Sequence, residues 1–154
     1  MHTIEKIGGT SMSDYVSVRN NIIFKPGNSS NLYQRVFVVS AYGGITDKLL
    51  EHKRSGQPGV YALFASSMED KSWLHALEQL KCEMYDINLS LFGNGKLLTR
   101  ANNFIDERLL GARKCLTDLH SLCMHGHFCL DAHLATVREM LASIGEAHSA
   151  WNMV

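Results

Sequence analysis

The chain has 154 residues, of which 45% are hydrophobic and 19% charged, and 15 basic and 15 acidic residues give a formal net charge of zero. This composition is typical of a globular protein with one sizeable core. It argues against a nucleic-acid binder, which needs excess basic residues, and no apolar run approaches the roughly 20 residues of a membrane span. The first residues lack the apolar stretch of a signal peptide, so we expect a cytoplasmic protein with reduced cysteines.

Two strand–turn–helix units are expected in the N-terminal third. Residues 3–7 alternate between apolar and polar side chains and run into a glycine pair at 8–9, which predicts a short strand and a tight turn. Apolar residues then recur at helical spacing over 15–23, with Ser11 or Ser13 as the N-cap.

The second unit follows a cluster of helix-breaking residues at 25–31. Residues 35–40 are a continuous β-branched and aromatic run, which is typical of a strand covered on both faces. The run leads to a glycine pair at 43–44, and a helix is expected from Thr46, which taken alone is interpreted as its N-cap. Together the two units predict an α/β fold with parallel strands.

Long helices are predicted in the second half of the chain. Apolar residues recur at helical spacing over 73–91, 104–119 and 134–144, and these stripes are interpreted as core-facing surfaces. The expected caps and stops are Ser67 with Asp70, the glycines at 93 and 95, Gly126 and Asp131.

The first glycine turn is a candidate phosphate site because ligands of open α/β sheets bind at the carboxyl ends of parallel strands. Gly8 and Gly9 would let the backbone approach an anion, beside Thr10 and Ser11, and Lys6 could supply a positive charge. The pattern matches neither the dinucleotide-binding fingerprint nor a Walker A loop. An ordinary tight turn that needs glycine therefore stays open as the alternative.

Three motifs stand at 6–12 (Lys-Ile-Gly-Gly-Thr-Ser-Met), 38–47 (Val-Val-Ser-Ala-Tyr-Gly-Gly-Ile-Thr-Asp) and 143–150 (Ser-Ile-Gly-Glu-Ala-His-Ser-Ala). In order and separation they resemble the aspartate kinases, whose signatures are Lys-Phe-Gly-Gly-Thr-Ser, Val-Ser-Ala followed by Gly-Ile/Val-Thr-Asn, and Ser-x-Gly-Glu-x-x-Ser-Ala. The residues around 40–42 and 51–65 are most similar to the members associated with ectoine synthesis.

The resemblance implies part of a three-layer α/β/α amino acid kinase fold, with a mainly parallel sheet and a helix-rich second half. It also implies transfer of the γ-phosphoryl group of ATP, with Mg²⁺, to the β-carboxylate of L-aspartate, a reaction that asks mainly for positioning and charge stabilisation. Lys6 would be the catalytic residue, contacting the transferring phosphate oxygens. The other implied site residues are Gly8, Gly9, Thr10 and Ser11 against the phosphates, and Ser40, Thr46 and Glu146 at the aspartate.

Four positions depart from the family pattern. Ile7 replaces the usual Phe, Tyr42 and Gly43 are unusual within the second turn, and Asp47 replaces Asn. None of these departures removes a reacting group, although Asp47 adds a negative charge near an anion site.

The resemblance covers the whole chain but only the N-terminal part of the family. The remaining strands of the catalytic sheet, the arginine for the substrate α-carboxylate, most of the nucleotide pocket and the regulatory ACT domains would lie beyond it. We therefore expect residues 1–154 to form an incomplete catalytic domain that is inactive alone and becomes a homo-oligomer if apolar surface is left uncovered. A non-catalytic, self-associating or ligand-binding module stays open, as does a superfamily member acting on glutamate, carbamate or a nucleoside monophosphate.

A cluster of soft donors at Cys123, His125, His127, Cys129 and His133 offers a further reading. Such side chains could bind Zn²⁺. Their spacing matches no recognised zinc motif, and the segment stands where two predicted helices must be joined. The joint is the preferred interpretation, and no metal site is predicted.

Overall fold

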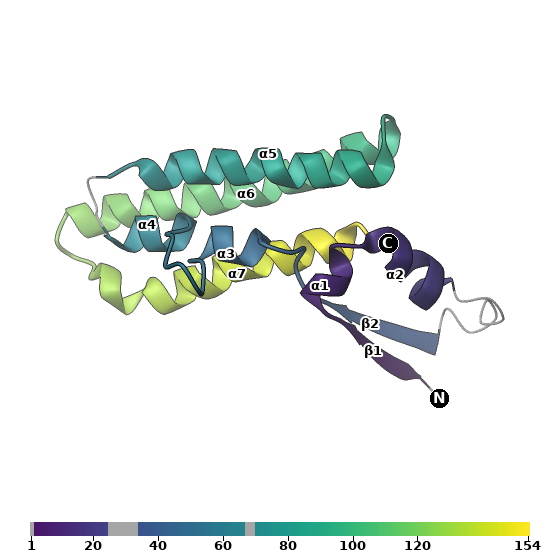
Figure 1. Cartoon of the computed structure of the whole chain (residues 1–154). Coiled ribbons are helices and arrows are strands. Elements are labelled where there is room, and N and C mark those ends of the chain that lie inside the picture. Colours follow the sequence, from purple (N-terminus) through teal and green to yellow (C-terminus); the bar gives the residue numbers. More distant parts are fainter. Residues whose placement is uncertain (1, 25–33, 67–69) are drawn as a thin grey trace.

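The protein is described here by a computed structural model that covers residues 2–24, 34–66 and 70–154. Strands β1 (Thr3–Ile7) and β2 (Arg35–Val39) pair in parallel, with Thr3 opposite Arg35 and Ile7 opposite Val39. This confirms the α/β class and the parallel pairing. In Figure 1 the two strands lie at one end of a long helical body.

Helices make up most of the remaining described chain. The three longest, predicted from their apolar stripes, are confirmed, whereas α4 was not predicted. No helix in the described ranges combines the length and the hydropathy that crossing a bilayer requires. The helical elements are α1 (Gly9–Met12), α2 (Tyr15–Val18), the π-helical η1 (Arg19–Ile23), α3 (Ile45–Leu49), α4 (Val60–Ser66), α5 (Ser72–Phe92), α6 (Lys96–Met124), the 3₁₀ turn η3 (Leu130–Ala132) and α7 (Leu134–Trp151).

Helices α5 and α6 form a hairpin, and α7 packs against it (Figure 1). The hairpin reverses at Gly93 and Gly95, whose φ values of 60° and 142° lie in the region that favours glycine. The apolar stripes face each other, so that Leu80, Ile105 and Leu141 are each at most 1% exposed. Burial of each such side chain contributes about 1.5–3 kcal/mol to folding.

The N-caps expected in the first half were wrong. The side chain that caps α2 is Asp14, whose Oδ1 accepts a hydrogen bond from the Ser17 amide at 3.2 Å, rather than Ser11 or Ser13. Helix α3 begins after Gly44, whose φ of 82° is left-handed, and Thr46 lies inside the helix.

The caps expected in the second half were wrong in part. Helix α5 begins after Lys71 without a side-chain cap, and Asp70 lies before the helix, where its carboxylate accepts the Ser72 amide at 2.8 Å. Asp131 instead lies in η3, and α7 begins after His133 without a side-chain cap. Ser67 and the breaker cluster at 25–31 lie outside the described residues.

One face of the sheet is left uncovered by the described residues. Ile4, Val36 and Val38 are 75%, 48% and 48% exposed, and the register places them side by side on that face. The expectation that β2 is covered on both faces is therefore not met in the described residues. The three-layer amino acid kinase fold stays a prediction.

On the other face of the sheet, Arg35 connects the two strands with the end of η1. Its guanidinium pairs with Glu5 across the strands at 2.6 Å and donates to the carbonyl oxygens of Ile22 and Ile23 at 2.7 and 3.0 Å. Cationic donors are favourable at the carbonyl end of a helix. Arg35 thus joins the two strands to the end of η1.

Candidate functional site

The first glycine turn lies against the second. A Cβ atom on Gly9 would stand 3.2 Å from the Ala41 carbonyl oxygen and 3.9 Å from the Ser40 Cβ, so this close approach favours glycine. The Ser40 amide donates to the Ile7 carbonyl at 3.0 Å and extends the pairing of the strands. The carboxyl ends of β1 and β2 therefore meet, as the sequence predicts.

Glycines also shape the second turn. A Cβ on Gly43 would lie 2.6 Å from the Ser13 Oγ, and Gly44 supplies the left-handed conformation from which α3 begins. A side chain at position 43 would push aside the Ser13 hydroxyl, which donates to the Gly9 carbonyl at 3.2 Å. The turn is held from the side of α1 as well as from the strands.

The third motif reaches the second turn from α7. A Cβ on Gly145 would stand 2.7 Å from the Ala41 Cβ, and the Ser149 hydroxyl donates to the Ser40 carbonyl at 2.8 Å. Residues more than 100 positions apart in the sequence are thus in direct contact. The structure brings parts of all three motifs together at the carboxyl ends of the strands.

The ionic side chains implied for the site are exposed. Lys6 lies at the end of β1, opposite Val38, and Glu146 lies on α7. Neither has an ion-pair partner among the described residues, and no hydrogen bond joins them. Both charges are therefore available to a ligand.

The hydroxyl groups implied for the site fall into two sets. Thr10 and Ser11 are exposed in the short helix α1, whereas Ser40 and Thr46 are half-buried beside and within the second turn. The backbone of Ser40 is bonded to both other motifs, through the Ile7 carbonyl and the Ser149 hydroxyl.

Four buried polar residues beneath the second turn were missed by sequence reasoning. We call Tyr42, Asn88, His148 and Asn152 the buried polar cluster. Asn88 Oδ1 accepts from Asn152 Nδ2 at 2.9 Å and lies 2.6 Å from His148 Nε2, and Asn152 Nδ2 also donates to the Tyr42 hydroxyl at 3.2 Å. Because the amide oxygen accepts, Nε2 carries the proton of His148.

Burial keeps this cluster neutral. It lowers the pKa of His148 from 6.5 to about 4 and raises the pKa of Tyr42 from 10.0 to about 12. His148 Nδ1 and Asn152 Oδ1 have no hydrogen-bond partner within the described ranges. A signal was present in the sequence: Asn88 follows Met84 by four residues, and His148 follows Ile144 by four, so both continue an apolar stripe.

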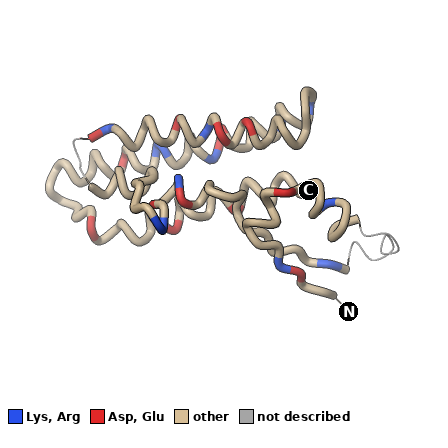
Figure 2. The backbone as a smooth tube through the Cα atoms, in the orientation of Figure 1, with Lys and Arg blue, Asp and Glu red and all other residues tan. Residues whose placement is uncertain are grey.

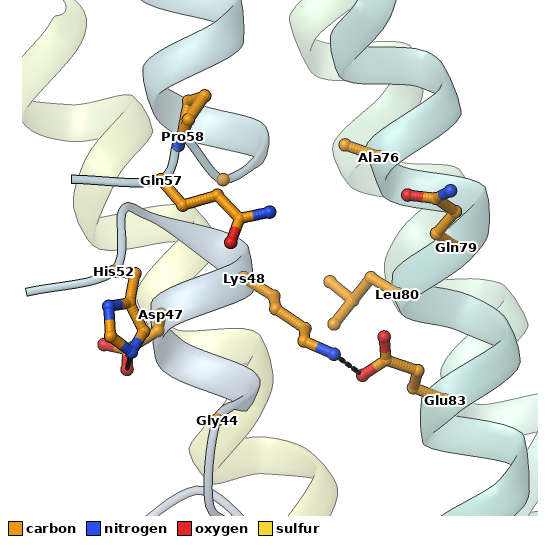
Figure 3. Close-up of a pocket in the computed structure, with 11 residues that line it drawn as sticks. Gly44, Asp47, Lys48, His52, Gln57, Pro58, Ala76, Gln79, Leu80 and Glu83 are labelled. Atoms are coloured by element: carbon orange, nitrogen blue, oxygen red, sulfur yellow. Dashed lines mark hydrogen bonds and ion pairs between the residues drawn. The ribbon is translucent and has the colours of Figure 1, made fainter. Parts of the chain in front are cut away.

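A cavity of about 510 Å³ lies between α3 and α5. Its Lys48 ammonium pairs with Glu83 (Figure 3). Asp47, one of the departures from the family pattern, lines the same cavity, with an oxygen 3.8 Å from the His52 ring. Lys48 thus compensates the charge of Glu83 on the cavity wall.

The charged residues of the described chain are interspersed. Basic and acidic positions alternate along the helical body, without a stripe of one sign (Figure 2).

The Cys123–His133 segment joins α6 to α7. Helix α6 ends at Met124, and Gly126 follows with a φ of 71°. Cys123 is buried and Cys129 exposed, and both thiols are free. In the part of the chain that the structure describes, no group of three or more His, Cys, Asp or Glu side chains is placed to hold a metal ion.

The chain is 51% identical, over all 154 residues, to the aspartate kinase Ask_Ect of Stutzerimonas stutzeri (strain A1501). The resemblance to an aspartate kinase of the ectoine type is confirmed. The match covers 32% of that kinase, so the chain spans about a third of its length and corresponds to its N-terminal portion. No family model and no solved structure matches the chain.

Proposed function

We propose that the chain is the N-terminal part of the catalytic domain of an aspartate kinase, which transfers the γ-phosphoryl group of ATP to the β-carboxylate of L-aspartate. The identity to Ask_Ect supports the reaction type. The observation that carries the proposal is the contact of α7 with the second turn, where Ser149 holds the Ser40 carbonyl and Gly145 packs on Ala41. This contact joins the motifs that the reaction needs.

The phosphate side of the proposed site is the first glycine turn. Lys6, which has no ion-pair partner among the described residues, offers its ammonium group to the transferring phosphate oxygens, and Gly8 leaves open space for close approach of the nucleotide. Thr10 and Ser11 add exposed hydroxyl donors. In phosphoryl transfer, positioning and charge neutralisation of this kind supply most of the catalysis.

Magnesium, which the resemblance implies, accompanies the nucleotide in this proposal. The described residues contain no cluster of carboxylates or imidazoles that would hold a metal by itself.

The aspartate side is the second turn with α7. Ser40 and Thr46 present hydroxyl groups from the turn and the first part of α3, and Glu146 presents a carboxylate without an ion-pair partner in the described chain. A carboxylate suits the α-ammonium group of the substrate, and the hydroxyls suit its carboxylates. Oriented in this way, the β-carboxylate would face the phosphate side.

The test is a chimera in which this chain replaces the matching segment of the S. stutzeri kinase. Aspartate-dependent formation of aspartyl hydroxamate is expected, and Lys6→Ala should lower kcat by about 10²–10³-fold because a charge that stabilises the transition state is lost. Lys96→Ala, an exposed lysine at the start of α6, is the matched control and should leave kcat within about twofold. A Lys6→Ala chimera as active as this control would remove Lys6 from the proposal.

The 154-residue chain alone is expected to form no aspartyl hydroxamate. Turnover by the isolated chain would contradict the proposal that it is part of a larger site.

One observation favours a second candidate, a self-associating module. The uncovered face at Ile4, Val36 and Val38 exposes apolar surface that a second copy could cover. Sedimentation of the isolated chain should then depend on concentration, and the double change Val36→Thr and Val38→Thr should abolish this dependence. A concentration-independent monomer would contradict the second candidate and leave the kinase proposal unaffected.

A further inference from the structure

The buried polar cluster lies in the interior of the protein, where apolar residues would pack without needing hydrogen-bond partners. His148 and Asn88 are 0% exposed, Asn152 is 4% and Tyr42 is 5% exposed. Burial of polar groups costs free energy unless their hydrogen bonds are made, and a network fixes directions that apolar packing leaves free. A cluster in this position therefore invites a functional explanation.

Asn88 is the centre of the cluster. Its Oδ1 accepts from His148 on α7 and from Asn152, which follows the end of α7, and its Nδ2 donates to Asn102 Oδ1 on α6 at 3.0 Å. One side chain of α5 thus fixes the rotation of α7 relative to the helical hairpin.

The second turn is attached to the same centre through Tyr42. The edge of the Tyr42 ring packs on His148, with ring centroids 5.1 Å apart, and its hydroxyl accepts from Asn152. Tyr15 on α2 donates to the Asn152 carbonyl at 3.2 Å and secures the other side of this residue. The ring and the hydroxyl group of Tyr42 therefore both attach the second turn to the cluster.

Both connections lead to residues of the proposed aspartate site. Tyr42 lies in the turn between Ser40 and Thr46. His148 lies next to Ser149, which holds the Ser40 carbonyl, and two residues after Glu146.

We infer that the buried polar cluster sets the geometry of the aspartate side, with Tyr42 and His148 as positioning residues for Ser40, Thr46 and Glu146. The inference rests on the proposed function for the identity of the ligand. It also explains the unusual Tyr42 of the second motif, because the aromatic ring has its partner, His148, in the third motif. The two positions form one unit across the fold.

The first test uses the active chimera. His148→Leu and Tyr42→Phe each remove one polar group and keep the volume, and each should raise the KM for aspartate by about three- to tenfold, the effect of one buried hydrogen bond. The KM for ATP should stay within about twofold. His148→Gln, which keeps a side-chain N–H donor, should restore the aspartate KM.

The matched control is Leu116→Val, a fully buried change on α6 outside the cluster. It lowers stability without touching the turn and should leave both KM values unchanged. If the cluster variants raise the KM values for ATP and aspartate alike, or if Leu116→Val has the same effect, the cluster has only a structural role and the inference is wrong.

The second test needs no activity and uses the 154-residue chain itself. Tyr42→Phe and His148→Leu should shift the backbone amide NMR signals of residues 40–46, whereas Leu116→Val should leave them in place. The imidazole signals of His148 should show one neutral tautomer protonated at Nε2. Unshifted signals at 40–46 overturn the inference even if the chimera is an aspartate kinase. If the signals shift but the parent chimera is folded and inactive, the proposed function is wrong. The anchoring of the turn by the cluster then still holds.

Discussion

The helical body and the sheet end of this molecule differ in how completely each buries its apolar residues. Met84, Leu116 and Leu141 in the body are fully buried, whereas Ile4 and Val36 in the sheet are 75% and 48% exposed. Helices of a hairpin cover one another through contacts close in sequence, but a parallel strand pair needs a further layer on each face. The proposed site lies at the junction, where α7 meets the carboxyl ends of the strands.

The largest expected contrast is in stability. Leu116→Ala should lower the free energy of unfolding by about 2–5 kcal/mol because it opens a cavity in the body. Val36→Ala on the open face should change it by no more than about 0.5 kcal/mol. Urea unfolding of both variants measures the difference, and equal losses would show that the sheet face is covered in solution.

The junction itself can be tested at Gly145. A Cβ there would stand 2.7 Å from the Ala41 Cβ, so Gly145→Ala should cost about 1–3 kcal/mol through overpacking. Gly111→Ala is the matched control, because a Cβ at this exposed helical glycine meets nothing within 4 Å and should stabilise the chain by about 0.4–1 kcal/mol. Thermal unfolding of the pair gives the comparison. A stabilising Gly145→Ala would contradict the close packing of α7 on the second turn.

The buried imidazole of His148 makes the junction sensitive to acid. Its folded-state pKa of about 4 lies below the ordinary 6.5, so the unfolded chain binds the proton more tightly. The free energy of unfolding should therefore be fully retained above pH 6.5 and fall as the pH drops toward 4, by at most about 1.4 kcal/mol per pH unit.

Unfolding of His148→Gln across this pH range provides the control, because the variant should lack that part of the pH dependence. The same pH profile in both proteins would show that His148 is accessible to protons in the folded state.

The smallest expected effect concerns the ion pair of the sheet. The Arg35 side chain is 7% exposed, and Glu5→Gln should lower the free energy of unfolding by about 1 kcal/mol because the guanidinium loses the carboxylate charge and one of its two acceptor oxygens. The matched change Glu83→Gln, at the exposed pair with Lys48, should cost less than about 0.5 kcal/mol. Denaturant unfolding at low and high salt measures both effects. Equal losses of the free energy of unfolding in the two variants would contradict this prediction.

Much of the fold could be predicted from spacing alone. The alternation at 3–7 and the stripe at 73–91 report local periodicity, and they correspond to β1 and α5. The cap expected at Thr46 failed because the start of α3 is set by the left-handed Gly44 and its tertiary surroundings. Local sequence contains no information about that packing.

The parts of the candidate site that lie within the three sequence motifs could be predicted from the sequence. The meeting of Gly9 with Ser40 follows from parallel strands ending at the same edge. The roles of Asn88 and His148 could not be derived in the same way, because a polar residue within an apolar stripe finds its partner only after the helices have packed. Their 2.6 Å contact spans 60 positions of sequence.

The small sheet has a consequence for how the chain meets other polypeptides. In the described residues, β1 and β2 pair only with each other, so the outer side of each strand has backbone N–H and C=O groups facing no neighbouring strand. Such borders accept a further strand by backbone hydrogen bonds, whatever its side chains. A later segment of a longer chain and a strand from another molecule would compete for the same borders. The order in which they arrive during synthesis would then decide between assembly and aggregation.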